Sequence, residues 1–469
     1  MKRFLIGVSV SAVFACAALA SDGDPRTSGS GDIVPTGADI YLNAAALGGL
    51  GTGTSWANAY TNVADAIAAL NASPDGHTVL RIAGGVYHMP SAQSVTKASF
   101  AILGGYKAAS DGDLTCDPAE YQTIFTGDKA INNLWGHITP KLGEYSFASA
   151  ATAQKMFVGG KMNPPVFTGD FDNYCIWAPD GLNAVQLTVA SGAGGTVGGI
   201  VFTHVYRSTN VKLAEGSTGT TLTNCVFYGN YTQGSCFVDA SSAVDLVVGC
   251  RFLYNLNDYG CTVMGVQATT VKDCEITGNR SQSYYGTAQV SGGDATFENC
   301  VFTRNLAFCN SDAAATSSYG IGNICNGVGT RLHFLRCVMT NNYSYATVTS
   351  YGMPLMSLRD GQVTDCVIAN NRSEVKPVDG FAYTLCGSQY ATGCSATWSG
   401  TLFSGNVIAA PALNMEGGSY ALAIVGNNMA MCNSLINCTF VSNRVEYVAA
   451  DGVTPVLSRG VVASALSDG

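Results

Sequence analysis

The chain has 469 residues, a formal net charge of −9 and only 12% charged residues. It has no basic stripe that could neutralise phosphates, which excludes a nucleic-acid-binding protein. After the N-terminus no segment stays apolar over the ~20 residues that a membrane-spanning helix needs, so we predict no transmembrane segment there.

The first 20 residues have the pattern of a secretory signal peptide. Met1-Lys2-Arg3 precedes an apolar run that ends in the small residues Ala18-Leu19-Ala20. We therefore predict cleavage after Ala20 and a secreted or cell-surface location. Residues 21–37 are rich in Gly, Ser and Asp and are predicted to be a flexible linker.

Residues 38–130 are predicted to form an N-terminal cap and the first coils of a β structure. Apolar, β-branched runs predict strands over 39–43, 78–82, 84–87, 100–106 and 123–128. Val63, Ala66, Ile67 and Leu70 recur at helical spacing and predict one helix over 61–70, as a cap on a sheet end requires. Residues 131–215 are predicted to be irregular coils with long loops.

Residues 216–469 repeat one short motif eight times, with successive copies 24 to 37 residues apart. A fixed motif at variable intervals is typical of stacked units with loop insertions. The copies are Cys225-Val-Phe-Tyr-Gly-Asn230, Cys250-Arg-Phe-Leu-Tyr-Asn255, Cys274-Glu-Ile-Thr-Gly-Asn279, Cys300-Val-Phe-Thr-Arg-Asn305, Cys337-Val-Met-Thr-Asn-Asn342, Cys366-Val-Ile-Ala-Asn-Asn371, Thr401-Leu-Phe-Ser-Gly-Asn406 and Cys438-Thr-Phe-Val-Ser-Asn443.

Each motif has the alternation of a β-strand. The Cys and the residue two positions later are apolar in almost every copy, whereas the residue between them includes Arg251 and Glu275. Period-two alternation therefore points the Cys and Phe inward and the residue between them outward. Because no helical pattern separates the motifs, we predict an all-β fold, a right-handed parallel β-helix with a short N-terminal capping helix.

The Asn that ends each motif is predicted to be structural. Asn tolerates the left-handed backbone of a tight turn, and its amide can bond the equivalent amide one coil away. We expect a ladder of Asn230, Asn255, Asn279, Asn305, Asn342, Asn371, Asn406 and Asn443.

Fourteen of the 17 cysteines fall into two predicted groups. Seven occupy the inward motif position, where Cys acts as a small hydrophobe, and are expected to be buried and reduced: Cys225, Cys250, Cys274, Cys300, Cys337, Cys366 and Cys438. Cysteines outside the motif are the expected disulfide formers: Cys236, Cys261, Cys309, Cys325, Cys386, Cys394 and Cys432. Among these we predict the pairs Cys386–Cys394 and Cys309–Cys325.

The N-terminal residues Ser55-Trp56-Ala57, Gly84-Gly85-Val86-Tyr87 and Leu103-Gly-Gly-Tyr106 resemble the cap of secreted bacterial right-handed β-helix proteins of the pectin-lyase-like superfamily. The Phe-x-x-Asn steps resemble the repeats of polymorphic outer-membrane autotransporter passengers. The resemblance covers most of residues 38–445 and implies the fold, with polysaccharide cleavage or surface adhesion as its known uses. The chain stops just after a repeat, so we expect truncation, or a partner or anchor that covers its last coil.

Catalytic candidates are few. The acidic and Gly-His-Gly motifs of the hydrolase branch are absent from the sequence, and we interpret the five His as incidental. Lyases of this fold use acidic Ca²⁺ ligands and an Arg or Lys base, for which the candidates are Asp273, Asp365, Arg280 and Arg372. Asp273 and Asp365 occupy a motif position that elsewhere holds Asn or Gly, which favours a turn role.

Asp111, Asp113 and Asp117 have the density of oxygen ligands that a Ca²⁺ loop uses. Gln122 stands where such a loop would close with a bidentate Glu, so a polar loop is the favoured interpretation. No cofactor is predicted, and Ca²⁺ is the one ion that the sequence leaves open.

Tyrosines near the Asn turns are predicted to form an exposed aromatic edge that binds sugar rings or another protein. The alternative, weighed equally, is that they cover the turns. The residues are Tyr228, Tyr231, Tyr254, Tyr259, Tyr284 and Tyr285. The sequence thus favours a non-catalytic surface protein that binds a polysaccharide or a cell-surface protein. A polysaccharide lyase or glycoside hydrolase is the alternative.

Overall fold

The chain divides into residues 1–36 and a second compact unit, residues 37–469. Residues 1–38, which hold the predicted signal peptide and linker, lie outside the described part of the chain. The computed structural model describes residues 39–74, 76–127, 141–142, 145–146, 157–158, 161–162, 182–217, 219–233, 236–240, 245–258, 262–266, 270–282, 288–290, 294–309, 325–326, 331–346, 356–358, 361–374, 382–388, 395–410, 421–427, 432–448, 455–459 and 463–465.

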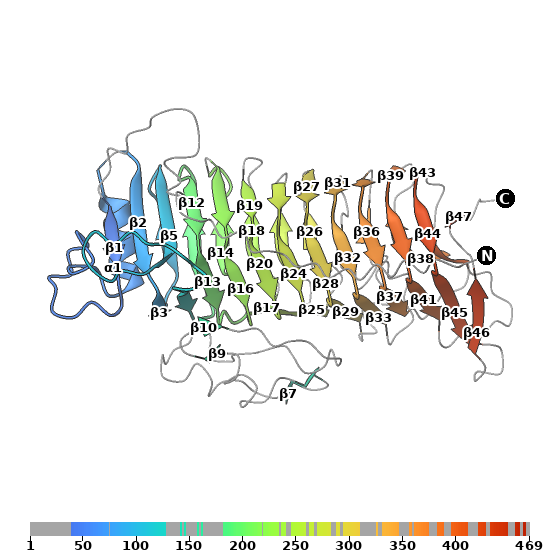
Figure 1. The fold of residues 1–469 in the computed structure, drawn as a ribbon, viewed down its shortest axis with the longest axis horizontal. Helices are drawn as coiled ribbons and strands as arrows, with labels where there is room; N and C mark the ends of the chain where they lie inside the picture. The colour runs from blue at the N-terminus through green and yellow to red at the C-terminus, as the bar shows by residue number, and fades with distance from the viewer. Residues whose placement is uncertain are drawn as a thin grey trace, which may run out of the picture. The chain divides into compact units, whose positions relative to one another are not determined.

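The second unit is a right-handed parallel β-helix, as the sequence predicted (Figure 1). Each regular coil has four short strands, and each strand pairs in parallel with its equivalents in the neighbouring coils. We number the four sheets in the order in which the chain meets them within a coil. Sheet 1 is followed by sheet 2, sheet 3 and sheet 4.

The strands of sheet 1 are β1 Ile40–Leu42, β2 Thr78–Ala83, β5 Phe100–Tyr106, β12 Gly195–Gly198, β15 Thr220–Thr223, β19 Leu246–Val248, β23 Thr270–Lys272, β27 Ala295–Glu298, β31 Leu332–Leu335, β35 Gln362–Thr364, β39 Ser395–Ser399 and β43 Cys432–Ile436. Those of sheet 2 are β3 Gly85–His88, β6 Thr123–Thr126, β13 Ile200–Thr203, β16 Val226–Tyr228, β20 Arg251–Leu253, β24 Glu275–Thr277, β28 Val301–Thr303, β32 Val338–Thr340, β36 Val367–Ala369, β40 Leu402–Ser404 and β44 Thr439–Val441.

The strands of sheet 3 are β17 Tyr231–Gln233, β21 Leu256–Asp258, β25 Arg280–Gln282, β29 Leu306–Cys309, β33 Tyr343–Ala346, β37 Arg372–Glu374, β41 Val407–Ala410, β45 Arg444–Val448 and β46 Pro455–Arg459. Those of sheet 4 are β4 Gln93–Val95, β11 Leu187–Val189, β14 Val211–Leu213, β18 Cys236–Ala240, β22 Thr262–Val266, β26 Ala288–Val290, β30 Cys325–Asn326, β34 Met356–Ser357, β38 Ala382–Ser388, β42 Ala421–Asn427 and β47 Ala463–Ala465. Two short hairpins join β7 Lys141–Leu142 to β8 Tyr145–Ser146 and β9 Phe157–Val158 to β10 Lys161–Met162.

The N-terminal end of the stack carries the predicted helix, α1 Val63–Ala72. The helix begins at Asn62, whose Oδ1 accepts a hydrogen bond from the backbone N–H of Asp65 at 2.9 Å, as N-cap residues do. Its buried side chains, Val63, Ala66, Ile67 and Leu70, join the hydrophobic core of the stack. The apolar face predicted from spacing is therefore the face that closes the core.

The interior of sheet 2 is a column of stacked apolar side chains in register. Phe227 pairs with Phe252, and their rings stack with centroids 4.7 Å apart. Both side chains are fully buried, whereas the neighbouring Arg251 is exposed and bonds Glu275 of the next coil at 2.7 Å. The inward and outward assignments made from alternation are thus confirmed.

The motif asparagines form a continuous buried ladder. From Asn255 to Asn443, each Asn Oδ1 accepts from the backbone N–H and the Nδ2 of the Asn one coil earlier, and the Nδ2–Oδ1 distances are 2.9–3.1 Å. The second Nδ2 hydrogen goes to a carbonyl oxygen one coil back, as from Asn305 to Ile276 at 2.8 Å. One detail of the expectation was wrong: the left-handed residue is the one before the Asn, for example Arg304 at φ 56°.

The motif cysteines form a second column of free thiols, at the corner between sheets 1 and 2. Cys225, Cys250, Cys274, Cys300, Cys337 and Cys366 are buried, and Cys438 in the last motif is partly exposed. Each thiol donates to a carbonyl oxygen of the preceding coil, such as Cys250 to Leu222 at 3.5 Å. Burial raises the pKa of the Cys250 thiol well above its ordinary value.

The disulfide predictions were wrong where the structure tests them. Cys386 is a free, buried thiol inside β38, so it forms no bridge with Cys394. Cys236 also forms no disulfide and lies in a strand, β18. We predicted both residues in turns because the strands of sheet 4 do not carry the recurring motif found in sheet 2. The side chains of Cys309 and Cys325 lie outside the described residues.

At the C-terminal end, the four sheets finish differently. β46 pairs antiparallel with β45, and β47 extends sheet 4 on β42. β43 and β44 are the last strands of sheets 1 and 2. The inward residue Leu435 is 37% exposed there, whereas Trp398, its equivalent one coil earlier, is fully buried. The expected C-terminal partner or anchor remains a prediction.

The ladder predicts the effect of Asn305→Ala. The substitution removes the acceptor of two Asn279 donors and the donor to Ile276, all buried. Each buried group left without its partner costs ~1–3 kcal/mol, so we expect the free energy of unfolding to fall by about 3 kcal/mol or more. Urea denaturation measures it. Thr296→Ala, at an outward position in the same coil, is the control and should change the free energy of unfolding by less than about 0.5 kcal/mol. Equal losses of stability in the two variants would contradict a structural role of the ladder.

Thiol labelling tests the burial of the cysteines. Cys116 is an exposed residue, but partial desolvation of its thiol raises the pKa to about 11, so little thiolate is present at pH 8. We expect iodoacetamide to label Cys116 about two orders of magnitude more slowly than an ordinary cysteine at pH 8, and faster as the pH rises towards 11. The buried motif thiols should react only after denaturation. Labelling of Cys250 in the native protein would contradict the inward assignment.

Candidate functional site

Three of the six tyrosines proposed as an exposed edge are buried. Tyr228, Tyr231 and Tyr254 are only 3–4% exposed. The Tyr254 ring contacts Tyr228 edge-on, with centroids 6.0 Å apart, and covers Gly278 of the next coil so closely that a Cβ there would lie 2.5 Å from it. The prediction that these three side chains are exposed was therefore wrong. They cover the turns, as the alternative interpretation held.

Tyr259, Tyr284 and Tyr285 lie outside the described residues. The strand bounds nevertheless fix which corner of the coil they belong to. Tyr259 falls between β21 and β22, and the other two fall between β25 and β26. All three belong to the connection from sheet 3 to sheet 4, which we call the 3–4 corner.

The 3–4 corner contains the longest connections of the regular coils. Sheets 1 and 2 are joined by two-residue turns, such as Asn224-Cys225, and so are sheets 2 and 3. The links from sheet 3 to sheet 4 are residues 234–235, 259–261, 283–287, 310–324, 347–355, 375–381 and 411–420. The first three of these links have 2 to 5 residues and the four from residue 310 onward have 7 to 15, whereas the links from sheet 4 back to sheet 1 have 3 to 6.

The acidic catalytic candidates lie at a turn between sheets 1 and 2. Asp273 and Asp365 both have φ 53°, the left-handed conformation that Asn, Asp and Gly tolerate best. Asp273 Oδ1 accepts from Asn299 Nδ2 at 3.0 Å. Asp273, Asn299, Arg336 and Asp365 occupy the same position in four successive coils. Two coils therefore lie between the two Asp residues. The structure therefore does not bring them together, and their backbone fits the turn interpretation.

The basic candidates lie at the opposite end of the same strands. Arg372 begins β37 and Asp365 precedes β36, so the three residues of β36, about 10 Å of extended chain, separate them. Arg372 Nη1 bonds Glu446 Oε2 at 2.8 Å. Burial opposes ionisation of Glu446, but hydrogen bonds from Arg444 and Arg372 hold its pKa below the ordinary value. Arg280 occupies the equivalent place in β25, and its side chain is not described.

The three Asp residues of the candidate Ca²⁺ loop bond backbone amides. Asp111 Oδ1 accepts from Ala57 at 2.8 Å, and Asp117 Oδ1 accepts from Ala119 at 2.9 Å. Hydrogen bonds from Thr115 lower the pKa of Asp113. Within the described residues no group of three or more His, Cys, Asp or Glu is placed to hold a metal ion. These contacts are those of a polar loop that fixes the cap.

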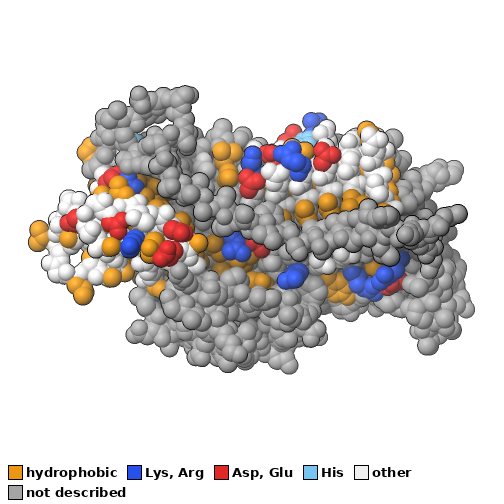
Figure 2. All heavy atoms as spheres, in the orientation of Figure 1, with side chains coloured by type: hydrophobic (Ala, Val, Ile, Leu, Met, Phe, Trp, Pro, Cys, Tyr) orange, Lys and Arg blue, Asp and Glu red, His pale blue; other side chains and the backbone are white. Residues whose placement is uncertain are grey.

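Charged side chains on the outer faces of sheets 1 and 2 pair with one another. Lys272 and Arg336 both contact Glu298, the former at 3.6 Å. Figure 2 shows basic and acidic groups lying next to each other on the face it presents. Paired charges of opposite sign cancel at a distance, so the groups that are paired here create little field to attract an acidic polymer. In the described part of the chain, no helix is long and apolar enough to span a membrane.

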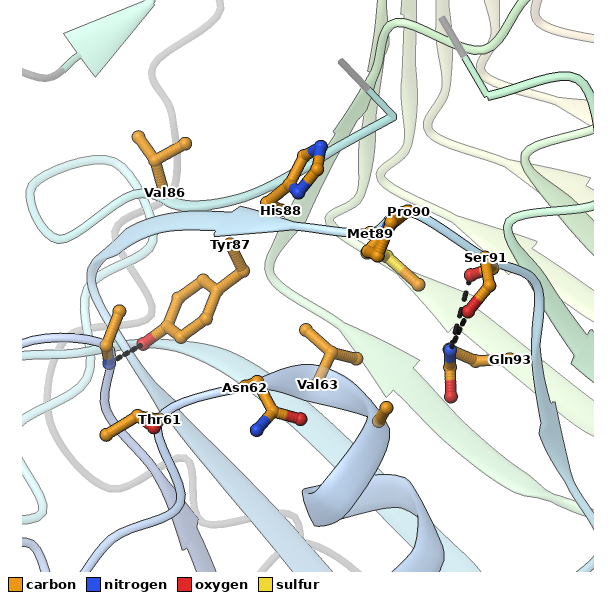
Figure 3. Close-up of a pocket in the computed structure, with 12 residues that line it drawn as sticks. Thr61, Asn62, Val63, Val86, Tyr87, His88, Met89, Pro90, Ser91 and Gln93 are labelled. Carbon is orange, nitrogen blue, oxygen red and sulfur yellow. Dashed lines mark hydrogen bonds between the residues drawn. The ribbon is translucent and has the colours of Figure 1, made fainter. Parts of the chain in front are cut away.

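A pocket of about 420 Å³ lies between the start of α1 and the segment from β3 to β4 (Figure 3). Its buried lining consists of Val63, Tyr87 and Met89. Its polar lining consists of Thr61, Asn62, His88, Ser91 and Gln93. Sequence reasoning missed this site because residues from three separate segments line it, and His88 carries no motif around it.

No protein-family model matches the chain, and no curated protein matches it. Solved structures do match at low identity. Pectate lyase Pel9A is 12% identical over 79% of this chain and 77% of its own, with a TM-score of 0.36. A glycoside hydrolase is 11% identical over 86% and 96%, with a TM-score of 0.35. The adhesin PfbA of Streptococcus pneumoniae is 12% identical over 87% and 99%, with a TM-score of 0.24. Likeness of this degree transfers no activity.

Tyr254→Ala separates a structural tyrosine from a binding one. Because the ring is buried against Tyr228 and Gly278, we expect its loss to lower the free energy of unfolding by about 3 kcal/mol, as for other large aromatic truncations. Chemical denaturation measures the change. Leu246→Ala, at a 40% exposed position of sheet 1, is the control and should cost less than about 1 kcal/mol. An unchanged stability for Tyr254→Ala would restore a binding role.

Proposed function

We propose that the protein is a non-catalytic extracellular or cell-surface β-helix that binds a polysaccharide or a surface protein through the 3–4 corner. The observation on which the proposal rests is the position of the long connections. From residue 310 onward the connections from sheet 3 to sheet 4 have 7 to 15 residues, while the turns between sheets 1, 2 and 3 stay two residues long. Loops on a rigid scaffold are where proteins most often place binding residues.

The repeat gives such a surface a defined geometry. Coils about 4.8 Å apart present equivalent positions along a line, which suits a ligand that is itself a repeating chain. Tyr259, Tyr284 and Tyr285 belong to this corner and remain the proposed ligand-binding tyrosines. Aromatic side chains offer an apolar face and a polar tip, and sugar rings bind to both.

The candidate acids and bases support a non-catalytic role through the places they occupy. Asp273 and Asp365 have the left-handed backbone of a turn. Arg372 is ion-paired to Glu446, two coils further along sheet 3. A lyase would need its base and its acidic Ca²⁺ ligands to converge on one substrate, whereas these residues lie at opposite ends of their strands.

A panel of plant, algal and host glycans, with and without Ca²⁺, tests the proposal. We expect binding without release of reducing or unsaturated ends, and a loss of affinity of about tenfold or more in the double variant Tyr284→Ala/Tyr285→Ala. Leu246→Ala, exposed on sheet 1, is the control and should bind as the unaltered protein does. Because Tyr231 and Tyr254 are buried, variants there would report stability and not binding.

Two outcomes would contradict the proposal. Turnover of any panel polysaccharide that is abolished by Asp273→Asn or Arg280→Ala would make the protein an enzyme. Binding that survives the double tyrosine variant and is lost on changing sheet 1 would move the binding surface away from the 3–4 corner.

A further inference from the structure

We infer that the C-terminal end of sheets 1 and 2 is a docking site for an extended segment of another polypeptide, which adds one strand to each of the two sheets. The site is the outer edge of β43 and β44, which we call the open edge. It is separate from the 3–4 corner, and the inference does not depend on the proposed function. Unpaired backbone groups, the composition of the two strands and the end of the asparagine ladder support it.

The last coil is closed in two sheets and open in the other two (Figure 1). β46 pairs with the outer edge of β45, and β47 pairs with β42. Among the described residues, no strand pairs with the outer edge of β43 or of β44. An unpaired strand edge presents a row of backbone donors and acceptors that an extended peptide can bind.

Backbone N–H groups at the open edge lack the acceptors that their equivalents have one coil earlier. There, the N–H of Gly405 donates to the carbonyl of Val441 at 2.9 Å. The N–H of Asn406 donates to Asn443 Oδ1 at 3.0 Å. In the last coil, the groups with no such acceptor in the described part of the chain are the N–H groups of Asn437, Ser442 and Asn443.

The open edge also lacks the features that keep a free strand from pairing. Residues 432–443 contain no Asp, Glu, Lys, Arg or Pro. By contrast β46, the edge strand of sheet 3 at the same end, carries both Pro455 and Arg459. Free edges in natural proteins usually bear charges, Pro or a bulge that prevents association. The contrast indicates that β46 is a finished edge and that β43 and β44 are edges to be covered.

Apolar side chains are exposed along the open edge. Leu435, the inward residue of β43, is 37% exposed, and Ile436 and Val441 are exposed on the outer face. Phe440 stacks on Phe403 with ring centroids 4.6 Å apart, yet it is only partly buried. A strand with an inward apolar residue in each sheet would cover Leu435 and Phe440, as each coil covers the one before it.

The end of the asparagine ladder specifies one side chain of the partner. Asn443 Oδ1 already accepts twice from Asn406, so the next unit has to supply an acceptor for the N–H and the second Nδ2 hydrogen of Asn443. Each ladder Asn also donates to a Phe-position carbonyl one coil back, as Asn443 does to Phe403 at 2.8 Å. Only an amide side chain both accepts and donates in this way, and Asn has the length that the ladder uses. The partner segment therefore has an inward apolar residue in each strand and an Asn after the second.

A second copy of this chain does not meet these requirements. At its N-terminal end the outer edge of β1 is occupied, because the N–H of Tyr41 donates to Gly53 and its carbonyl accepts from Tyr60, both at 2.9 Å. At its C-terminal end it presents the same donors of Asn443, and two sets of donors cannot bond each other. We therefore assign the open edge to a different polypeptide.

A synthetic peptide of residues 395–406 is the probe, measured by fluorescence anisotropy on the full chain. It presents Trp398 and Phe403 as inward residues and ends at Asn406. We expect saturable binding, weakened about tenfold or more by Asn406→Ala or Asn406→Asp in the peptide. Ser404→Ala, at an outward position, is the control and should stay within about twofold. No saturable binding, or equal binding of a scrambled peptide or of the Asn406→Ala peptide, would overturn the inference.

A matched pair of variants of the protein locates the site. Leu435 and Leu246 both lie in strands of sheet 1 and are similarly exposed, at 37% and 40%, but only Leu435 lies at the open edge. Leu435→Lys should weaken peptide binding by about tenfold or more, because a charge at a strand edge opposes pairing, and Leu246→Lys should stay within about twofold. Circular dichroism confirms that both variants are folded. Equal affinities of the two variants would contradict the assignment.

The thiol of Cys438 reports where the peptide binds. Cys438 lies in the turn between β43 and β44 and is partly exposed, whereas Cys116 is exposed in the cap region. The peptide contains no cysteine. Saturating peptide should slow the alkylation of Cys438 by about fivefold or more and leave that of Cys116 unchanged. Binding that leaves Cys438 equally reactive would place the peptide elsewhere and overturn the inference.

Analytical ultracentrifugation of the full chain distinguishes the remaining occupant, a second copy. We expect a monomer both for the unaltered protein and for Leu435→Lys. A dimer or larger assembly that Leu435→Lys dissociates, and that Leu246→Lys does not, would show that the open edge binds another copy of this chain and would overturn the choice of a different polypeptide.

Discussion

The fold depends on one interaction, the side-chain ladder of asparagines inside the corner between sheets 2 and 3. Each Asn from Asn230 to Asn406 uses both acceptor positions of its oxygen and both amide hydrogens, and these bonds are buried up to Asn371. A slip of one residue in any coil would leave several buried donors unpaired. The ladder therefore fixes the register of every coil it joins, and with it the Phe stack and the thiol column.

This constraint divides each coil into a fixed part and a free part. From sheet 1 to sheet 3 the chain has two left-handed turns at set positions, so insertions there would break the ladder and the stack. Beyond sheet 3 nothing in the motif sets the length of the connection. Residues that resemble catalytic groups, such as Asp273 and Asp365, lie in the fixed part, where backbone geometry explains them. Variation in length belongs to the free part, which is where we propose that binding takes place.

Much of the fold could be predicted because its signals are local. The alternation in each motif gave the inward Phe and the outward Arg251, and the spacing of Val63 to Leu70 gave the cap helix. The predictions that failed depend on contacts between residues far apart in the sequence. Tyr254 points away from the core, as the pattern said, but its burial depends on Gly278 of the next coil. Cys386 looked like a loop residue because β38 carries no repeated motif, and the pocket needs three segments brought together.

The cap shows why a pocket can arise beside so regular a scaffold. Within the stack, each coil buries the polar atoms of the last, as the asparagines do, so few are left to meet a ligand. At the cap the repeat has not begun: α1 occupies the place of a coil, and its first turn cannot follow the path of a strand. Val63 and Tyr87 close the core beneath, while the Nε2 of His88 is buried with no partner in a neighbouring coil. The mismatch between helix and strand thus leaves a space of about 420 Å³ at the start of α1.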